Sequence, residues 1–476
     1  MKKVYRAHPL MIFRFLKPFL FVLIIPLLEG VVQYAVHRRI SGILAAEITV
    51  FICIFLIAVM RWGKFSLSAD CREITMQTGV FFRQRHTVRL SCISSVTVRQ
   101  NPADFIFRAA TVSICTEAGR PNASDFEFKL SNRNAGELMT SLFGDERYAA
   151  VRFSAGRLAA SAALTSSALT GLLIGVPLFN RTGKVFGNAV NEALLNEINT
   201  VSSRFNTYFS PIFNTVVLIL LGAYGISFVY SLIRAFKFRL FSGRERLEVQ
   251  SGLFVRRRTA FSRDAVQDIS VEQTPLMRIA HRYMLCVSVA GFTTSRDNRA
   301  VVIPCGTAAD LHTGAAGLPF FEAAGHQIRP SQSRKSMARF LRIPLIAVAA
   351  TGAATAAAML AVPYFERFIM LLSIALLLAE GLICWFSHYL CRRGRLRFGE
   401  KVIYGRSVRG TAFCEMYIPR EHIGAVRITR TPADMRLGTC NVRLTVRSER
   451  GNRIRIWHLD RKAARTNLLK FLEIEE

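Results

Sequence analysis

Arginine is the side chain best placed to do chemistry in this sequence, because it recurs in tight groups beside apolar residues. The arginines fall into three groups: Arg83 and Arg85; Arg256, Arg257, Arg258 and Arg263; and Arg392 and Arg393. A guanidinium fork suits the oxygens of a phosphate group, and a basic cluster beside a cytoplasmic leaflet gains about 1 kcal/mol per charge from anionic lipid. These arginines are therefore candidates for contact with lipid headgroups. The alternative is that they only determine membrane topology and lie on solvated strand faces.

Carboxylates inside apolar stretches are the second group with chemical potential. There are three of them: Glu29, Glu47 and Glu380. A charge at membrane depth is costly and by default marks a functional site, so these acids could line the path of a transporter or channel. The alternative is that they lie near the membrane interface and are wetted there.

Cysteine and histidine give no sign of a metal or catalytic site. The chain has 10 cysteines and 9 histidines, but no Cys-x-x-Cys pair, no His-Glu-x-x-His and no Cys/His cluster at zinc-ligand spacing. Thr182-Gly183-Lys184 lacks the upstream glycine of a phosphate loop. The sequence therefore predicts no metal, no cofactor and no enzymatic activity.

Composition requires that apolar and basic residues be segregated. The chain is 51% hydrophobic, yet its net charge is +31, which excludes a single soluble core. Stretches of roughly 20 apolar residues predict membrane-spanning helices. Six such stretches pair into three hairpins: Pro18 to Val36 with Ile40 to Met60, Leu158 to Leu178 with Ile212 to Ile233, and Ile343 to Pro363 with Phe368 to Tyr389.

Basic residues also predict the orientation. Lysine and arginine concentrate in the long segments after the second, fourth and sixth predicted spans and are few in the short connections between paired spans. The positive-inside rule places the basic segments in the cytoplasm. Both termini are then cytoplasmic as well.

The long basic segments are copies of one unit. Thr78-Gly79-Val80-Phe81 matches Ser251-Gly252-Leu253-Phe254, and apolar anchors and prolines recur at the same two offsets. The anchors are Ile93, Val266 and Ile423, and the prolines are Pro102, Pro275 and Pro432. Glycine permits tight turns, and we expect equivalent early turns at Gly79, Gly252 and Gly405. In the third copy Arg430 replaces the glutamine found at Gln100 and Gln273, and a longer or reshaped first hairpin loop is expected there.

Each copy is predicted to be a small β barrel or sandwich closed by a helix. Val96/Val98, Val112/Ile114 and Phe126/Phe128/Leu130 alternate with polar residues, as in half-buried strands. Helices are expected over 134–143, 308–318 and 461–472. The predicted boundaries are 1–60 (N-terminal segment and hairpin 1), 61–150 (domain 1), 151–236 (hairpin 2), 237–330 (domain 2), 331–391 (hairpin 3) and 392–476 (domain 3).

One external segment, 179–211, is long enough to hold structure of its own. Apolar residues recur along it at helical spacing and include Phe186, Val190, Leu194 and Ile198. An amphipathic helix here could contact the outer leaflet or a partner protein. The alternative is a cap that packs over the protein's own spans.

The Gly-hydrophobic-aromatic turn, the Ile-x-x-Val-x-Val-x-Gln-x-Pro type of strand and the repeated hairpin-domain layout resemble a known family. This family is the bacterial membrane-flanked proteins with pleckstrin-homology-like domains of the second bacterial type, in particular the three-domain YdbT-like members. The resemblance implies a seven-stranded, partly open barrel with a C-terminal helix in each domain. It carries no catalytic motif.

The sequence thus predicts a polytopic α-helical protein of the bacterial cell membrane, with six spans and three cytoplasmic PH-like domains. We expect a non-enzymatic scaffold or adaptor that contacts the anionic inner leaflet. The resemblance further implies a membrane-protein partner, such as a smaller PH-like relative, and protection against membrane stress or antimicrobial compounds. The alternative function is a transporter or channel that uses the intramembrane acids. Nucleic acid is not expected as a partner, because the basic residues are spread over three domains without a recognition motif.

Overall fold

The computed structural model describes most of the chain. The described residues are 3–19, 42–70, 72–80, 82–117, 124–143, 149–186, 188–204, 211–243, 246–290, 299–315, 318, 326–328, 334–361, 366–447 and 452–472. The chain divides into two compact units. The first comprises Met1–Val151, Arg239–Ala265 and Val289–Arg299, and the second comprises Arg152–Phe238, Val266–Ser288 and Ala300–Glu476.

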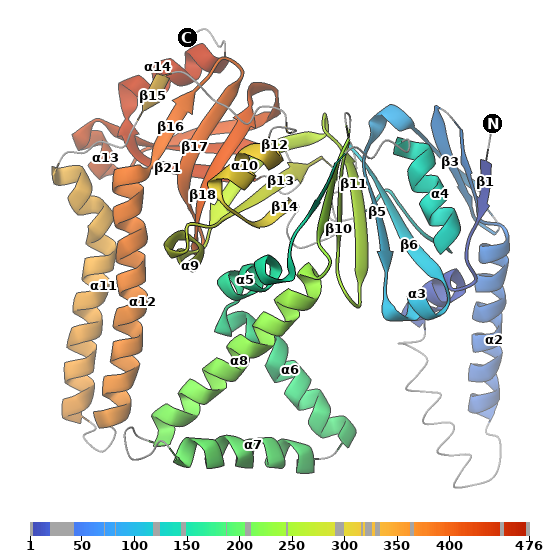
Figure 1. Cartoon of the computed structure of the whole chain (residues 1–476), viewed down its shortest axis with the longest axis horizontal. Coiled ribbons are helices and arrows are strands. Elements are labelled where there is room, and N and C mark those ends of the chain that lie inside the picture. The colour runs from blue at the N-terminus through green and yellow to red at the C-terminus, as the bar shows by residue number, and fades with distance from the viewer. Residues whose placement is uncertain are drawn as a thin grey trace. The chain divides into compact units, whose positions relative to one another are not determined.

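A four-stranded antiparallel sheet opens the first unit (Figure 1). Its strands, in order, are β1 (Lys3–Arg6), β2 (Ser66–Ala69), β3 (Glu73–Thr78) and β4 (Gln84–Arg89). β1 pairs with β2 from Lys3↔Ala69 to Arg6↔Ser66, although α2 (Gly42–Gly63) lies between them in sequence. In the sequence, the first predicted membrane hairpin therefore lies between the first and the second strand of this sheet.

A seven-stranded sheet in the same unit joins strands of two repeats. Its order is β7 (Phe126–Ser131), β6 (Ala109–Thr116), β5 (Ile93–Gln100), β11 (Arg256–Ser262), β10 (Arg246–Ser251), β9 (Arg239–Ser242) and β8 (Ala149–Arg152). The two halves meet at β5 and β11, which run antiparallel and lie side by side in Figure 1. Each repeat is thus one module, in which four strands are followed by three more strands and then by a helix.

The core of the first unit fills the space between module 1's two sets of strands. Leu67 and Ile74 of the first sheet are fully buried with Val112 and Phe128 of the second. Helix α4 (Asn132–Phe143) closes this core with Leu138, which is also fully buried. The predicted strands around Val96, Val112 and Phe128 and the predicted capping helix are confirmed.

Two further sheets form the second unit. One has seven strands in the order β14 (Arg299–Gly306), β13 (Tyr283–Val289), β12 (Val266–Gln273), β18 (Ala412–Pro419), β17 (Val402–Arg409), β16 (Arg395–Phe398) and β15 (His326–Ile328). The other has three, in the order β19 (Ile423–Thr429), β20 (Thr439–Val446) and β21 (Arg453–Asp460). Module 2 meets module 3 at β12 and β18, just as module 1 meets module 2 at β5 and β11.

Module 3 has its own core and its own capping helix. Met416 and Leu444 are nearly inaccessible to solvent, and Leu468 of α14 (Arg461–Leu472) packs in the same cluster. The short helices α3 (Pro102–Ile106), α9 (Pro275–Ile279) and α13 (Pro432–Leu437) each begin at one of the recurring prolines. Proline suits the first helical turn, whose amide has no intrahelical partner. The corresponding helix of module 2 is α10 (Ala308–Ala315).

The long helices of the second unit occur in two groups. α5 (Ala155–Thr165), α6 (Ala168–Phe186), α7 (Asn188–Ser203) and α8 (Pro211–Ala235) lie between β8 and β9 in sequence, and α11 (Arg334–Ala361) and α12 (Glu366–Arg393) between β15 and β16. Figure 1 shows α6, α7 and α8 as the sides of a triangle. Phe386 and Tyr389 near the end of α12 pack on Phe413 of β18.

The expectation of six membrane-spanning helices needs correction. Within the described residues, three helices are long and apolar enough to cross a membrane, Asn214–Ala235, Phe340–Ala361 and Leu372–Arg393, or four if a bent pair forms one span. The predicted span 18–36 lies almost wholly outside the described residues. Ile48–Gly63 of α2 is a shorter apolar helix.

The predicted span Leu158 to Leu178 is not one continuous helix, because the chain bends by 89° between α5 and α6. Ser166 ends α5 in an extended conformation, and its hydroxyl donates to the Ala162 carbonyl at 2.5 Å. α5 then docks on module 2, where Ser161 donates to the Pro304 carbonyl at 3.0 Å. A hydropathy pattern cannot detect such a bend, because serine is nearly neutral in it.

The expected turn at Gly405 is also wrong. Gly405 lies inside β17, opposite Met416, and Gly410 (φ 59°) forms the turn instead. The β17–β18 hairpin is tight, with Arg409 opposite Ala412. The first hairpin loop of the third copy is therefore not longer than those of the other copies. Gly405 makes room for Ile454 of β21, whose Cδ1 would lie 2.8 Å from an added Cβ.

Candidate anion-binding surface

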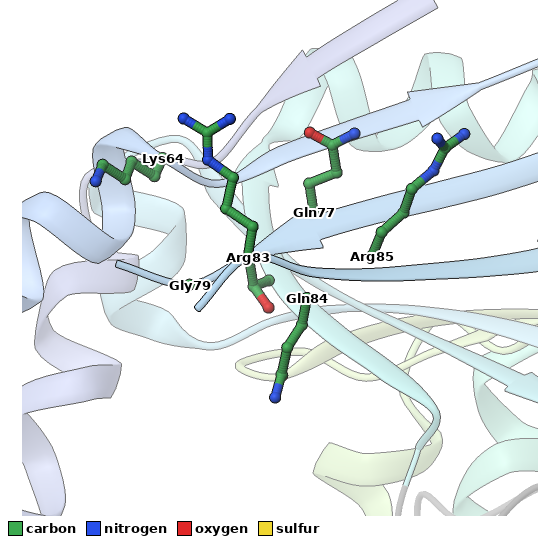
Figure 2. A pocket seen from close by; sticks show the side chains of 7 residues that line it. Lys64, Gln77, Gly79, Arg83, Gln84 and Arg85 are labelled. Carbon is green, nitrogen blue, oxygen red and sulfur yellow. The ribbon is translucent and has the colours of Figure 1, made fainter. Parts of the chain in front are cut away.

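A basic hollow of about 440 Å³ lies in the first unit, where α2 ends and the β3–β4 hairpin turns. Its lining residues are Lys64, Gln77, Thr78, Gly79, Arg83, Gln84 and Arg85. Three of these are cations, and no carboxylate is among them. Figure 2 shows Arg83 and Arg85 on one side of the hairpin and Gln84 on the opposite side, as strand alternation requires.

Backbone geometry fixes this hollow. Gly79 adopts φ 120°, and a Cβ there would lie 1.8 Å from the Phe82 carbonyl oxygen, so the turn requires glycine. Lys64 follows the last residue of α2, and its Nζ donates to the Val80 carbonyl at 3.1 Å. The end of the apolar helix and the tip of the hairpin are thereby joined.

In module 2, Arg258, which is equivalent to Arg85, and the nearby Arg263 have other neighbours. Arg258 donates through Nε and Nη2 to the two carboxylate oxygens of Glu248, at 2.5 and 3.1 Å. Arg263 donates to the Ser242 hydroxyl at 3.0 Å. Charge-assisted pairs of this kind engage the guanidinium. Arg258 and Arg263 are therefore weaker candidates for lipid contact than Arg83 and Arg85, which are exposed.

Arg256 belongs to a second exposed surface of the first unit. Its guanidinium carbon lies 5.1 Å from the ring centre of Phe105. Phe105, Ile106 and Phe107 follow one another at the end of α3 with exposed fractions of 58%, 75% and 57%. Arg257 lies next to Arg256 and opposite Arg99 on β5. We call the three apolar residues and Arg256 the apolar tip.

Arg392 and Arg393 are both exposed in the last turn of α12. A helix C-terminus carries partial negative charge that favours cations. Within the first unit, Arg83 and Arg85 line the basic hollow, whereas Arg256 belongs to the apolar tip, so the sequence-predicted arginines of this unit do not share one site. Lys64 and the three apolar residues of the tip were missed by sequence reasoning, although the run Phe105-Ile106-Phe107 shortly after Pro102 was a visible signal.

Of the three acids in apolar stretches, only Glu380 has a described side chain. Its Oε1 accepts a hydrogen bond from the Thr351 hydroxyl at 2.6 Å, which links α12 to α11, while Oε2 is buried without a partner among the described residues. Glu29 and the side chain of Glu47 lie outside the described residues. Also within the described residues, no three His, Cys, Asp or Glu side chains are grouped to hold a metal.

The segment that was predicted to be external contains the end of α6 and the whole of α7, and α7 contacts both α6 and α8. Asn191 donates to the Phe179 carbonyl at 3.4 Å, and Ser202 shares a hydrogen bond with Thr215 at 3.1 Å. Leu194 is 48% exposed and Ile198 is partly buried. The side chains of Phe186 and Val190 lie outside the described residues.

Two comparisons bear on the family. The sequence matches the bacterial PH domain family over residues 13–143 and 189–316, together more than half of the chain. No curated protein matches the sequence. The third module lies outside the matched residues but has the same strand order as the first two. The chain belongs to the bacterial PH domain family.

Proposed function

We propose that the protein is a non-enzymatic scaffold of the bacterial cell membrane, whose PH-like modules lie on the cytoplasmic side against anionic lipid. The basic hollow at the end of α2 carries this proposal. A smaller membrane protein with a PH-like domain and a protective role in the envelope are the finer parts of the proposal, and they come from the family resemblance.

The hollow lies where lipid headgroups would be. If α2 enters the membrane, its last residue, Gly63, reaches the interface, and Lys64 follows at headgroup level. Arg83 and Arg85 line the same hollow. An arginine fork beside a lysine suits a phosphate group, and none of the described lining residues is a carboxylate.

The apolar tip supports contact with a membrane surface. Exposed apolar residues next to a cation are typical of segments that enter the boundary between headgroups and acyl chains. Phe105, Ile106 and Phe107 are all more than half exposed, and Arg256 stacks on the first of them. Such a run would be a liability in water alone.

The test is lipid binding by the full-length chain in detergent, followed by native mass spectrometry. We expect phosphatidylglycerol to bind in preference to phosphatidylcholine, and higher salt to weaken binding. Arg83→Gln with Arg85→Gln should lower phosphatidylglycerol binding by roughly fivefold per charge, which corresponds to about 1 kcal/mol each.

The matched control is Arg133→Gln on α4, whose side chain is 89% exposed and lies outside the hollow. This variant should bind phosphatidylglycerol like the wild type. If the double variant binds like the control, or if binding ignores salt, the hollow is not a headgroup site.

A further inference from the structure

The two module junctions use the same strands in the same register. In the first unit, Val96 of β5 lies opposite Ala260 of β11. In the second unit, Ile269 of β12 lies opposite Tyr417 of β18. Val96 and Ile269 are equivalent positions of the repeat, and so are Ala260 and Tyr417. Each junction therefore joins the fourth strand of one module to the fifth strand of the module before it.

One fourth strand and one fifth strand take part in neither of these junctions. Among the described strands, β4 is at one end of the four-stranded sheet and β19 is at one end of the three-stranded sheet. β4 is the fourth strand of module 1, and β19 is the fifth strand of module 3. The chain thus carries both halves of a third junction, one in each unit.

Residues of β4 and β19 are more exposed than the equivalent residues at the internal junctions. Val98 and Val271 lie at internal junctions and are 9% and 6% exposed, whereas Ile428 occupies the same position of β19 and is 40% exposed. On the other strand, Ala260 is fully buried, whereas its equivalent Thr87 is exposed. An open strand edge offers unpaired backbone groups to another chain.

We propose that β4 of one copy of this protein pairs with β19 of a second copy, in the antiparallel register of the internal junctions. That register places Thr87 opposite Val426, His86 opposite Arg427 and Arg85 opposite Ile428. The surfaces that meet are different, so the contact is heterologous and joins copies head to tail.

Charge does not prevent this pairing. Like charges directly opposite one another on neighbouring strands cost up to about 1 kcal/mol. The internal junction β5–β11 contains such a pair, Arg99 opposite Arg257, and its ladder is intact. In the proposed junction that position holds Thr429 opposite Gln84, and Arg85 faces an apolar residue.

Site-specific photocrosslinking between two differently tagged full-length copies in one membrane tests the proposal. A benzophenone amino acid at Arg427, which is exposed, should capture the other copy at residues 84–89. The reciprocal probe at His86 should capture the other copy at residues 423–429. The control probe replaces Arg453, an exposed residue on β21 at the opposite end of the sheet, and should not capture residues 84–89.

Charge variants check the register in the same assay. Ile428→Glu should raise the crosslinked yield several-fold, because it places an acid opposite Arg85, and Ile428→Lys should lower it. Capture of another protein only, capture of β19 by β19, or equal yields from both variants would each overturn the proposal.

Discussion

Arg85 and Arg258 occupy equivalent strand positions but differ in their partners. Arg258 binds Glu248, whereas the residue equivalent to that acid is Thr75, whose hydroxyl pairs with Thr87 at 3.1 Å. The repeat predicted both arginines on a strand face. It could not predict that only one is neutralised, because the diagonal neighbour across a hairpin depends on strand register.

Asp434 is a residue whose role the sequence did not reveal. Its side chain is fully buried and accepts hydrogen bonds from Thr431, Thr439, Asn441 and His458. Burial alone would raise the pKa of Asp434, but these hydrogen bonds outweigh it and hold the pKa far below its usual range. Sequence spacing could not indicate this, because three of the four partners come from the strands that follow α13.

We expect Asp434→Asn to destabilise module 3 at neutral pH by roughly 1–3 kcal/mol, because buried donors lose their acceptor. A carboxylate with a lowered folded-state pKa adds stability that is fully present above its unfolded pKa of about 4 and is lost progressively as the pH falls from there through the folded-state pKa. Hydrogen exchange of the β20 amides at pH 7 and pH 3 measures both effects. The variant should differ from wild type at pH 7 and by a smaller margin at pH 3, and Asp264→Asn, at an exposed site, should match wild type at both. Equal protection of β20 in wild type and Asp434→Asn at pH 7 would contradict the prediction.

At the scale of elements, pattern reasoning found the strands with clear alternation and missed those too short to show it. β1 and β8 have four residues each and β15 has three, so no periodicity is visible in them. Their stability comes from pairing with strands on the far side of a helical hairpin, as β1 does with β2. Such long-range pairing leaves no mark in a local window.

The crossing of α6 and α8 gives a prediction at the same scale. A Cβ on Gly171 would lie 1.6 Å from the Ala223 carbonyl oxygen, so Gly171→Ala should push the two helices apart and cost about 1–3 kcal/mol. Thermal unfolding of the full-length chain in detergent measures this loss. Gly222→Ala on α8 is the matched control, because a Cβ there meets nothing within 4 Å. A similar melting temperature for both variants would show that α6 and α8 do not pack closely at Gly171.

At the scale of the whole molecule, the repeat predicted three modules. It did not predict that neighbouring modules contribute strands to the same sheet. Strands of module 1 and module 2 share one sheet, and strands of module 2 and module 3 share another. The reason is physical: β5 and β11 are separated by the whole second hairpin, and nothing in either strand specifies its neighbour across that distance. Adjacent modules are therefore joined by backbone hydrogen bonds rather than by linkers alone.

Orientation is the remaining prediction at this scale, and it follows from the asymmetry of basic residues. Modules on the cytoplasmic side require α7 on the outside, so a cysteine at Ser203 should react in intact cells with a membrane-impermeant maleimide, whereas a cysteine at Lys401 should not. Both positions are exposed, and both cysteines should react after permeabilisation. The wild-type chain reports background labelling of native cysteines. Labelling of Lys401→Cys in intact cells would place module 3 on the outside, away from the anionic leaflet on which the proposed function depends.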